Sequence, residues 1–279
     1  MMKKIKISLF DKKILKQFSF IVALISSIVG ILAISISFQD KCRWVWLISW
    51  SSILILIYFI LWIIANRKKK SKLLINGTKV NIYVGDIFGE KDGLKVIPVN
   101  EYFDTQIDDI VIAEKTLHGQ YIKHHCKNID ELENLVKKKK DNLLEVNKSR
   151  KVKGHKSRYD LGTIVEYDGF LLTAFTRFDE KNQAYLLGKD YLYFWGSFWT
   201  NFNELYAGRS VYIPLFGSGI TRFKDQTPTS QELLENILLS MRVTGFKNKY
   251  PSSSVNIVID KDNANDIDFF HLKDRVGDK

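Results

Sequence analysis

Residues 211–222 read Val-Tyr-Ile-Pro-Leu-Phe-Gly-Ser-Gly-Ile-Thr-Arg, an apolar run that ends in a Gly-Ser-Gly turn. We expect a buried strand over Val211–Leu215, because continuous apolar runs are typical of strands covered on both faces. The two glycines let the backbone approach a ligand closely, and amide N–H groups that point one way bind phosphate. Ser218 and Thr221 add hydroxyls, and Arg222 adds a cation suited to a diphosphate. The stretch predicts a phosphate loop, and the alternative is a plain strand-to-loop connection.

Further strands and helices are expected on both sides of this stretch. The expected strands are Val80–Val84, Lys95–Val99, Thr163–Tyr167, Leu171–Phe178 and Val255–Ile259. Three helices are expected between them: one capped by Asp130 and Glu133, one within Tyr191–Leu205, and one that starts with a Thr229–Glu232 capping box. Strands interspersed with helices predict a mixed α/β sandwich.

Two more segments place polar residues where strands end. Val84-Gly85-Asp86-Ile87 closes one strand, and its carboxylate could accept a hydrogen bond from the exocyclic amine of adenine. Residues 97–104, Ile-Pro-Val-Asn-Glu-Tyr-Phe-Asp, run from a second strand into polar side chains, with Leu-His-Gly-Gln beyond at 117–120. Each alone would be an ordinary turn or polar loop. Because ligands of α/β sheets lie off the carboxyl ends of strands, the segments together favour a ligand site.

The net charge of +11 belongs to the N-terminal quarter of the chain. Residues 1–72 hold 13 Lys and Arg and only two acids, whereas residues 73–279 hold 29 basic and 29 acidic residues. A basic isoelectric point often indicates a nucleic-acid partner, but the large C-terminal part is neutral. We therefore expect no nucleic acid partner.

The N-terminal charge instead flanks two apolar segments, Phe18–Phe38 and Trp44–Ala65, of 21 and 22 residues without a formal charge. About 20 helical residues cross a bilayer, so residues 18–65 predict a two-helix transmembrane hairpin. Most of the basic residues lie in the N-terminal segment 1–17 and in the connector 66–78. Positive flanks stay cytoplasmic, so we expect a multi-pass membrane protein with both termini inside.

The first span also carries small residues at steps of three and four. They are Ala23, Ser26, Gly30, Ala33 and Ser37, and this spacing puts them on one helical face. Small residues on one face let helix backbones approach in lipid. The face could pack on the second span of the same chain, which we favour, or between chains, and both can hold.

Signatures of a metal or redox site are missing from the sequence. The five histidines lack ligand spacing, and no P-loop, GxGxxG or GxSxG motif occurs. Cys42 and Cys126 are expected on opposite sides of the membrane, so they do not pair. We expect no cofactor and no metal.

The three polar segments resemble those of the macrodomain, an ADP-ribose-binding fold, over roughly residues 79–260. Gly85-Asp86-Ile87 is similar to its adenine-contacting strand end, and Ile213-Pro214 followed by Gly217-Ser218-Gly219-Ile220 is similar to its diphosphate loop. The amino-acid sequence of residues 96–105, 117–121 and 213–222 resembles one subfamily, the macrodomain of membrane-anchored Thoeris ThsA anti-phage effectors. The resemblance implies a three-layer α/β/α sandwich with a mixed sheet over residues 79–272.

The resemblance also implies a function. A partner TIR-domain protein would convert NAD into an ADP-ribose-type messenger, in this form a histidine conjugate, and the macrodomain would bind it. The effector would then form a homo-oligomer and damage the membrane, in abortive infection. The implied ligand residues are Asp86 and Ile87 at adenine, Asn100, Glu101, Asp104 and Gly119 at the distal ribose, and Gly217, Ser218, Gly219, Ile220, Thr221 and Arg222 at the diphosphate.

Two rival hypotheses remain beside this non-catalytic effector. One is a membrane-tethered ADP-ribosyl hydrolase, in which Asn100 or Asp104 would position the attacking water. The other is a passive anchor or scaffold whose domain binds only protein and has no nucleotide site.

Overall fold

The structure, a computed structural model, describes residues 5–33, 43–90, 92–250 and 252–276, and the chain divides into two compact units. The first unit ends at Lys69 and also takes in Asp268–Phe270. The second unit begins at Lys70, runs to Ile267 and resumes at His271.

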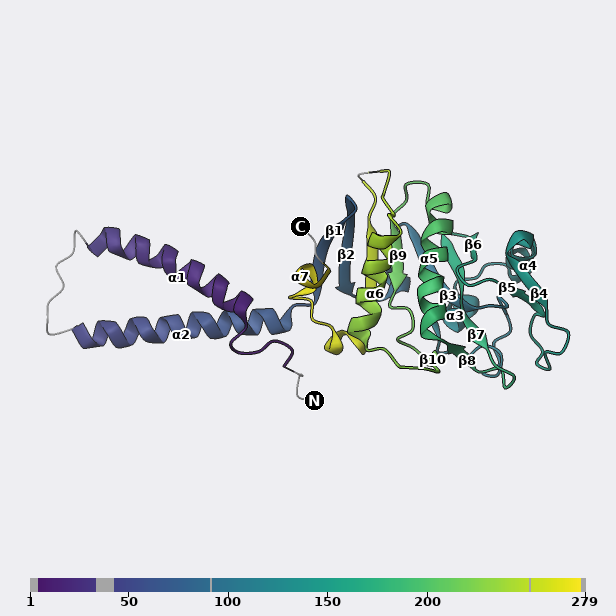
Figure 1. The fold of residues 1–279 in the computed structure, drawn as a ribbon, viewed down its shortest axis with the longest axis horizontal. Coiled ribbons are helices and arrows are strands. Elements are labelled where there is room, and N and C mark those ends of the chain that lie inside the picture. The colour runs from purple at the N-terminus through teal and green to yellow at the C-terminus, as the bar shows by residue number, and fades with distance from the viewer. Residues whose placement is uncertain (1–4, 34–42, 91, 251, 277–279) are drawn as a thin grey trace. The chain divides into compact units, whose positions relative to one another are not determined.

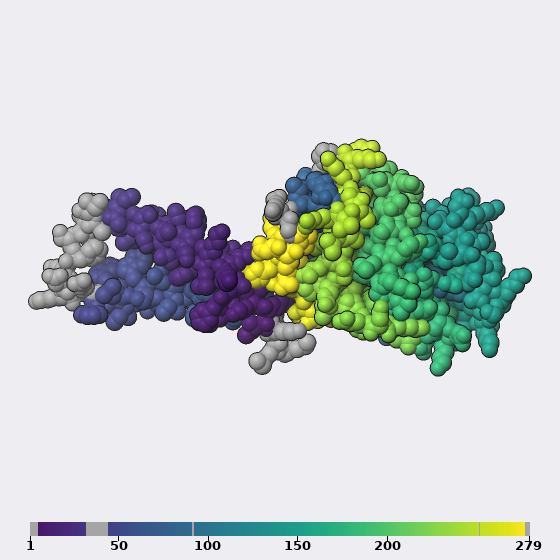
Figure 2. All heavy atoms as spheres, in the orientation of Figure 1, coloured from purple at the N-terminus to yellow at the C-terminus, as the bar shows by residue number. Residues whose placement is uncertain are grey.

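The first unit is built from two apolar helices, α1 (Lys12–Ala33) and α2 (Arg43–Arg67). Both are long and apolar enough to cross a membrane. Their apolar side chains are mostly exposed, which suits a lipid environment and not a protein core. Figure 2 shows the atoms of both helices, in purple and blue, largely uncovered by other parts of the chain. The end of the first predicted span and most of the predicted link, residues 34–42, lie outside the described residues.

The small-residue face of α1 does not pack on α2. The half-buried side chains of α1 include Phe18, Ile21 and Ile25, and the Phe18 ring meets Tyr58 of α2 edge-on with centroids 5.2 Å apart. The predicted small residues Ala23, Ser26 and Gly30 are exposed instead. The prediction that this face packs on the second span of the same chain is therefore wrong at these positions, because bulkier side chains form the contact with α2. Ser37 lies outside the described residues.

The second unit is organised around one mixed sheet (Figure 1). Its strands, in spatial order, are β1 (Lys70–Ile75), β2 (Thr78–Val84), β11 (Val255–Ile259), β9 (Val211–Pro214), β3 (Leu94–Asn100), β7 (Phe170–Phe178), β8 (Ala184–Leu186) and β10 (Arg222–Phe223), with β6 (Ile164–Tyr167) also paired to β7. The five strands from β2 to β7 run parallel to one another. All six predicted strands are confirmed.

Helices cover both faces of this sheet, which gives three layers. The helices of this unit are α3 (Leu117–His124), α4 (Ile129–Lys137), α5 (Gly188–Leu205), α6 (Ser230–Val243) and α7 (Leu272–Val276), with short 3₁₀ turns η2 (Ile87–Gly89), η3 (Lys140–Asn142) and η4 (Asn263–Asp266). Along β7, Phe170 and Leu172 join the core beneath α3 and α4, whereas Phe175 packs on Phe194 of α5. Alternating side chains point to opposite faces, so α5 covers the face opposite α3 and α4. The predicted α/β/α sandwich is confirmed.

Local differences from the sequence expectation have simple causes. The α6 capping box of Thr229 and Glu232 is present as predicted. The cap of α4 is Asn128 and not Asp130, because the Asn128 side chain accepts the backbone N–H of Glu131. Beyond α4, the chain forms β4 (Leu143–Val146), which pairs with β5 (Ser157–Tyr159) in a separate two-stranded sheet.

The segment expected as a basic connector, residues 66–78, contains the edge strand β1. Its side chains alternate between exposed and buried, so Lys70 and Lys72 point to solvent while Leu73 and Ile75 are buried. Lysine on an edge strand commonly prevents that strand from pairing with a strand of another molecule. The basic composition therefore marks an edge and not an irregular linker.

The ladder between β9 and β3 is short. It pairs Leu94 with Val211 and Lys95 with Tyr212 and then stops, although both strands continue. The carboxyl ends of these two strands are therefore not joined by pairing. A break of this kind at the carboxyl edge of parallel strands is where α/β folds usually place their ligand crevice.

Candidate ligand-binding site

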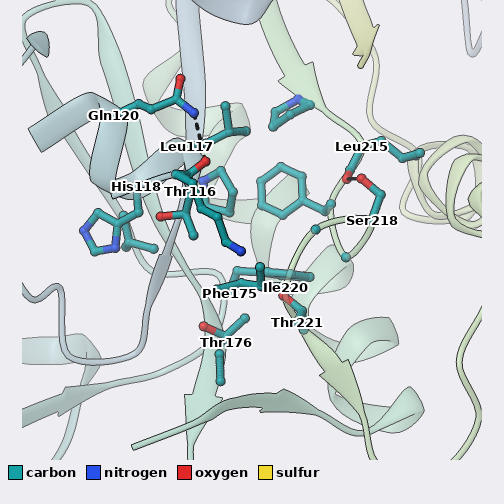
Figure 3. Close-up of a pocket in the computed structure, with 18 of the residues that line it drawn as sticks. Thr116, Leu117, His118, Gln120, Phe175, Thr176, Leu215, Ser218, Ile220 and Thr221 are labelled. Carbon is teal, nitrogen blue, oxygen red and sulfur yellow. Dashed lines mark hydrogen bonds between the residues drawn. The ribbon is translucent and has the colours of Figure 1, made fainter. Parts of the chain in front are cut away.

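A cavity of about 540 Å³ opens at this carboxyl edge. Its walls come from the ends of β2, β11, β9, β3 and β7 and from the start of α3. In Figure 3, Thr116, Leu117 and Gln120 lie on one side, and Ser218 and Thr221 lie on the other. A concave site of this size suits a small organic ligand. Eight of the twelve predicted ligand residues line it: Asp86, Ile87, Asn100, Gly217, Ser218, Gly219, Ile220 and Thr221.

The loop after β9 forms a tight turn on the cavity wall. The backbone N–H of Ser218 and its hydroxyl both donate to the carbonyl of Leu215, at 3.3 Å and 2.7 Å. Gly217 has φ of +88°, a left-handed conformation that favours glycine. Within the described residues, the N–H groups of Gly219, Ile220 and Thr221 have no hydrogen-bond partner. Three successive unpaired amides at a cavity wall are the arrangement that cradles an anion.

The opposite end of the edge carries Asp86. The backbone N–H of Gly85 donates to Ile259 of β11 at 3.0 Å, which fixes the end of β2. Asp86 then caps η2, since its Oδ1 accepts the N–H of Phe88 at 3.0 Å. Oδ2 of this carboxylate remains an acceptor for a donor such as an exocyclic amine. Ile87 beside it is buried and gives this end an apolar wall.

Asn100 lies at the end of β3 and is 3% exposed. Its Oδ1 accepts the backbone N–H groups of Tyr102 and Asp104, at 3.0 Å and 3.4 Å. Its Nδ2 has no hydrogen-bond partner among the described residues, so it is the group that can donate to a ligand. The turn that comes next is tight, with Phe103 at φ of +50°.

Glu101 and Asp104, predicted near the distal ribose, do not line the cavity. Both carboxylates are buried, 1% exposed, and each is held by arginine. Glu101 accepts from Arg158 Nε at 2.9 Å and from Arg177 Nη1 at 3.3 Å. These acids anchor the loop after β3 and are not available to a ligand. The structure does not bring these two acids to the cavity, because arginines from later in the chain hold their carboxylates.

Gly119 and Arg222 also lie outside the cavity wall. Gly119 is buried in α3, where a Cβ atom would come within 2.5 Å of the Ala113 carbonyl oxygen. It allows the helix to approach the preceding loop, a packing role. Arg222 is on β10, and its Nη2 pairs with Asp179 Oδ2 at 3.3 Å. The predicted diphosphate cation therefore points elsewhere.

Several cavity residues were not predicted from the sequence. They are Lys115 and Thr116 just before α3, Thr176 on β7, and Asp260, Asp262 and Asn263 after β11. The last group comes directly after an expected strand, so the rule that parallel strands share a carboxyl edge could have found it. Lys115 and Thr116 had no such signal, because they lie 15 and 16 residues beyond the end of β3.

His118 contributes a neutral imidazole to the wall. It is 6% exposed, and burial lowers its pKa from 6.5 to about 4. Its Nε2 has no hydrogen-bond partner among the described residues. The ring points away from Ser218 and Thr221 in Figure 3, so it packs on the side of the cavity wall that faces the protein interior. The described residues contain no group of three or more His, Cys, Asp or Glu side chains that could hold a metal ion.

Comparison with known proteins places the chain in a family. Residues 80–260 match the family model described as Thoeris protein ThsA, Macro domain. The curated Thoeris protein ThsA of Bacillus amyloliquefaciens (strain Y2) is 37% identical over 249 residues, which cover 86% of this chain and 82% of that protein. The match therefore extends beyond the macrodomain alone.

Solved structures of a macrodomain from Oceanobacillus iheyensis are also similar. A variant of it with ADPR is 14% identical, with a TM-score of 0.46, over 75% of this chain and 100% of that one. The same macrodomain with ADP is 16% identical, with a TM-score of 0.42, over 73% and 94% of the two chains. The family match and the identity to the curated relative decide the assignment: this chain belongs to the Thoeris ThsA family and carries its macrodomain.

Proposed function

We propose that this protein is a membrane-anchored effector whose macrodomain binds an ADP-ribose-derived signal. The observation that carries this proposal is the row of unpaired N–H groups from Gly219 to Thr221, which lies on the same cavity as Asp86. The amides suit a diphosphate, and the carboxylate suits the amine of adenine. Asn100 lies on β3, the next strand beyond β9, where Nδ2 could donate to the distal ribose.

The proposal includes the membrane and the partners. The two apolar helices would span the bacterial plasma membrane with both termini in the cytoplasm, since the basic residues flank them on that side. A TIR-domain protein would act through its diffusible product, histidine-ADP-ribose being the form we favour. Ligand binding would favour self-assembly only if the assembled state binds the ligand more tightly. Assembly would then disrupt the membrane and cause abortive infection.

The runner-up function, a tethered ADP-ribosyl hydrolase, has less support from the geometry. Asp104 would have to position water, but both its oxygens are bound by Arg150, at 2.9 Å and 2.7 Å. Asn100 has its oxygen occupied by two backbone amides. The remaining amide nitrogen is a donor and cannot act as a general base. We therefore favour ligand binding without turnover.

Calorimetric titration of the full-length protein in detergent with ADP-ribose tests the binding step. The informative variant is Gly219→Asp, because a Cβ at this glycine meets no atom within 4 Å and its φ is not left-handed. The variant should fold like the wild type and lose ADP-ribose binding, since the new carboxylate would repel a diphosphate. Gly219→Ala is the matched control and should still bind. Wild-type protein that binds neither ADP-ribose nor a conjugate of it would refute the proposal.

Turnover and toxicity separate the rival functions. Incubation of the purified protein with an ADP-ribosylated protein should release no ADP-ribose; release would establish the hydrolase instead. Co-expression with a TIR-domain signal producer should be toxic to the cell. Deletion of residues 1–66 should remove that toxicity, and Gly219→Asp should remove it as well. Toxicity that survives Gly219→Asp would mean that the cavity does not receive the signal.

A further inference from the structure

The charges that line the cavity are distributed unevenly. Asp86 comes after β2, and Asp260 and Asp262 come after the neighbouring strand β11, so carboxylates gather at one end of the edge. Lys115 lies in the segment between β3 and α3, and β3 is the strand next to β9, which the amide row follows. Among the described residues that line the cavity, Lys115 is the one with a permanently cationic side chain. The carboxylates of the cavity therefore follow β2 and β11, whereas its one cation among the described residues comes from the segment after β3.

The neighbours of Lys115 leave its charge uncompensated. Glu114, the adjacent acid, pairs with Lys123 near the end of α3, at 2.5 Å. No carboxylate of the described residues lies within ion-pairing distance of the Lys115 ammonium. The backbone of Lys115 is held in place, since its carbonyl accepts Gln120 Nε2 at 2.9 Å (Figure 3). The side chain is exposed, so the ammonium is free to move toward a bound anion.

We propose that Lys115 recognises the anionic part of the ligand and fixes which way round the ligand binds. The inference rests on the proposed function and deepens it. A nucleoside end with amine donors is attracted to the carboxylates beside Asp86, whereas the diphosphate is attracted to the ammonium and to the amides of Gly219–Thr221. The reversed orientation would place phosphates among three carboxylates, which repel them. Lys115 thus takes the role that the sequence suggested for Arg222.

The experiment compares adenosine, ADP and ADP-ribose, three probes that share adenosine and differ in the group attached to its 5′ oxygen. Each is titrated into full-length wild-type protein and into Lys115→Gln. The variant should bind ADP and ADP-ribose about tenfold more weakly, as expected for loss of one charged hydrogen bond, and bind adenosine as the wild type does. Its affinity for ADP-ribose should also fall less steeply with added salt, because one screened ion pair is gone.

Lys138→Gln is the matched control, since Lys138 is exposed at the end of α4 and does not line the cavity. It should bind all three probes like the wild type. Equal affinity of wild type and Lys115→Gln for ADP-ribose would overturn the role of Lys115 and leave the proposed function standing. Equal weakening of adenosine binding would overturn it too, since the effect would then not involve the phosphates. Wild type that binds no probe would remove the proposed function and this inference together.

Discussion

Arg150 forms a bidentate ion pair with Asp104. Nη1 lies 2.9 Å from Oδ1 and Nη2 lies 2.7 Å from Oδ2, and the two side chains are 6% and 0% exposed. The same guanidinium also donates to the carbonyl of His155 and to Asn182 Oδ1. Asn182 in turn donates to the carbonyl of Ile110, next to the cavity wall. One buried ion pair therefore ties three loops at this end of the domain.

Replacing Arg150 should destabilise the domain strongly. Arg150→Met leaves the Asp104 carboxylate buried without its partner, and breaking a buried pair in this way costs about 3–5 kcal/mol. Chemical denaturation of the full-length protein in detergent, followed by near-UV circular dichroism, measures the change. Lys153→Met, on the same loop but exposed, is the control and should change stability by less than about 0.5 kcal/mol. Equal midpoints for the two variants would contradict the structural role of the pair.

This pair also shows why part of the site could not be predicted from the sequence. Glu101 and Asp104 lie just past a strand end, where ligand residues gather, and the rule was sound for Asn100 in the same segment. The two acids are drawn out of the site by arginines 46 or more residues later in the chain, Arg150 for Asp104 and Arg158 and Arg177 for Glu101. Local pattern carries no information about such distant partners.

His118 should make stability depend on pH. Its folded-state pKa of about 4 lies below its ordinary value of 6.5 because burial disfavours the charged imidazole. Between these two pH values the unfolded chain binds more protons than the folded chain. The contribution of His118 to the free energy of unfolding is therefore fully present above about pH 6.5 and is lost as the pH falls toward 4, by about 3 kcal/mol in total. Unfolding midpoints measured across this range should show the slope. His118→Leu should flatten it, whereas His124→Leu, an exposed residue of the same helix, should not. A slope that His118→Leu leaves intact would assign it to other groups.

The two glycines of the loop after β9 should respond differently to alanine. Gly217 has φ of +88°, and a Cβ there would lie 3.1 Å from Phe223 Cζ and 3.2 Å from Leu233 Cδ2. Gly217→Ala should therefore cost about 1–2 kcal/mol of stability and weaken ADP-ribose binding, because the amides of the next three residues would shift. Gly219→Ala, in open space, should leave the unfolding midpoint unchanged. Thermal unfolding of both variants checks this, and equal midpoints would show that the turn tolerates a side chain.

The sequence predicted the main sheet well, and the physical reason is the continuity of its apolar runs. Val255–Ile259 is buried throughout, and Val211–Leu215 is buried except at the half-buried Tyr212, which leaves few alternatives to a central strand. Short elements such as β8 and β10 have only three and two residues, too few for any periodicity. They form because β8 pairs with the end of β7, and β10 then pairs with β8. Tertiary pairing, and not local preference, creates them.

The exposed small-residue face of α1 leads to a prediction about assembly. A Cβ at Gly30 would meet no atom within 4 Å, so a larger residue fits the single chain without strain. If chains associate through this face, Gly30→Leu should separate the backbones and weaken self-association several-fold. Gly30→Ala keeps a small residue and should associate like the wild type. Energy transfer between labelled chains in bilayer nanodiscs or liposomes, with the ADP-ribose-type ligand present, measures the effect. Unchanged transfer in Gly30→Leu would exclude this face as the contact, while ligand binding by the same variant would show that its macrodomain is intact.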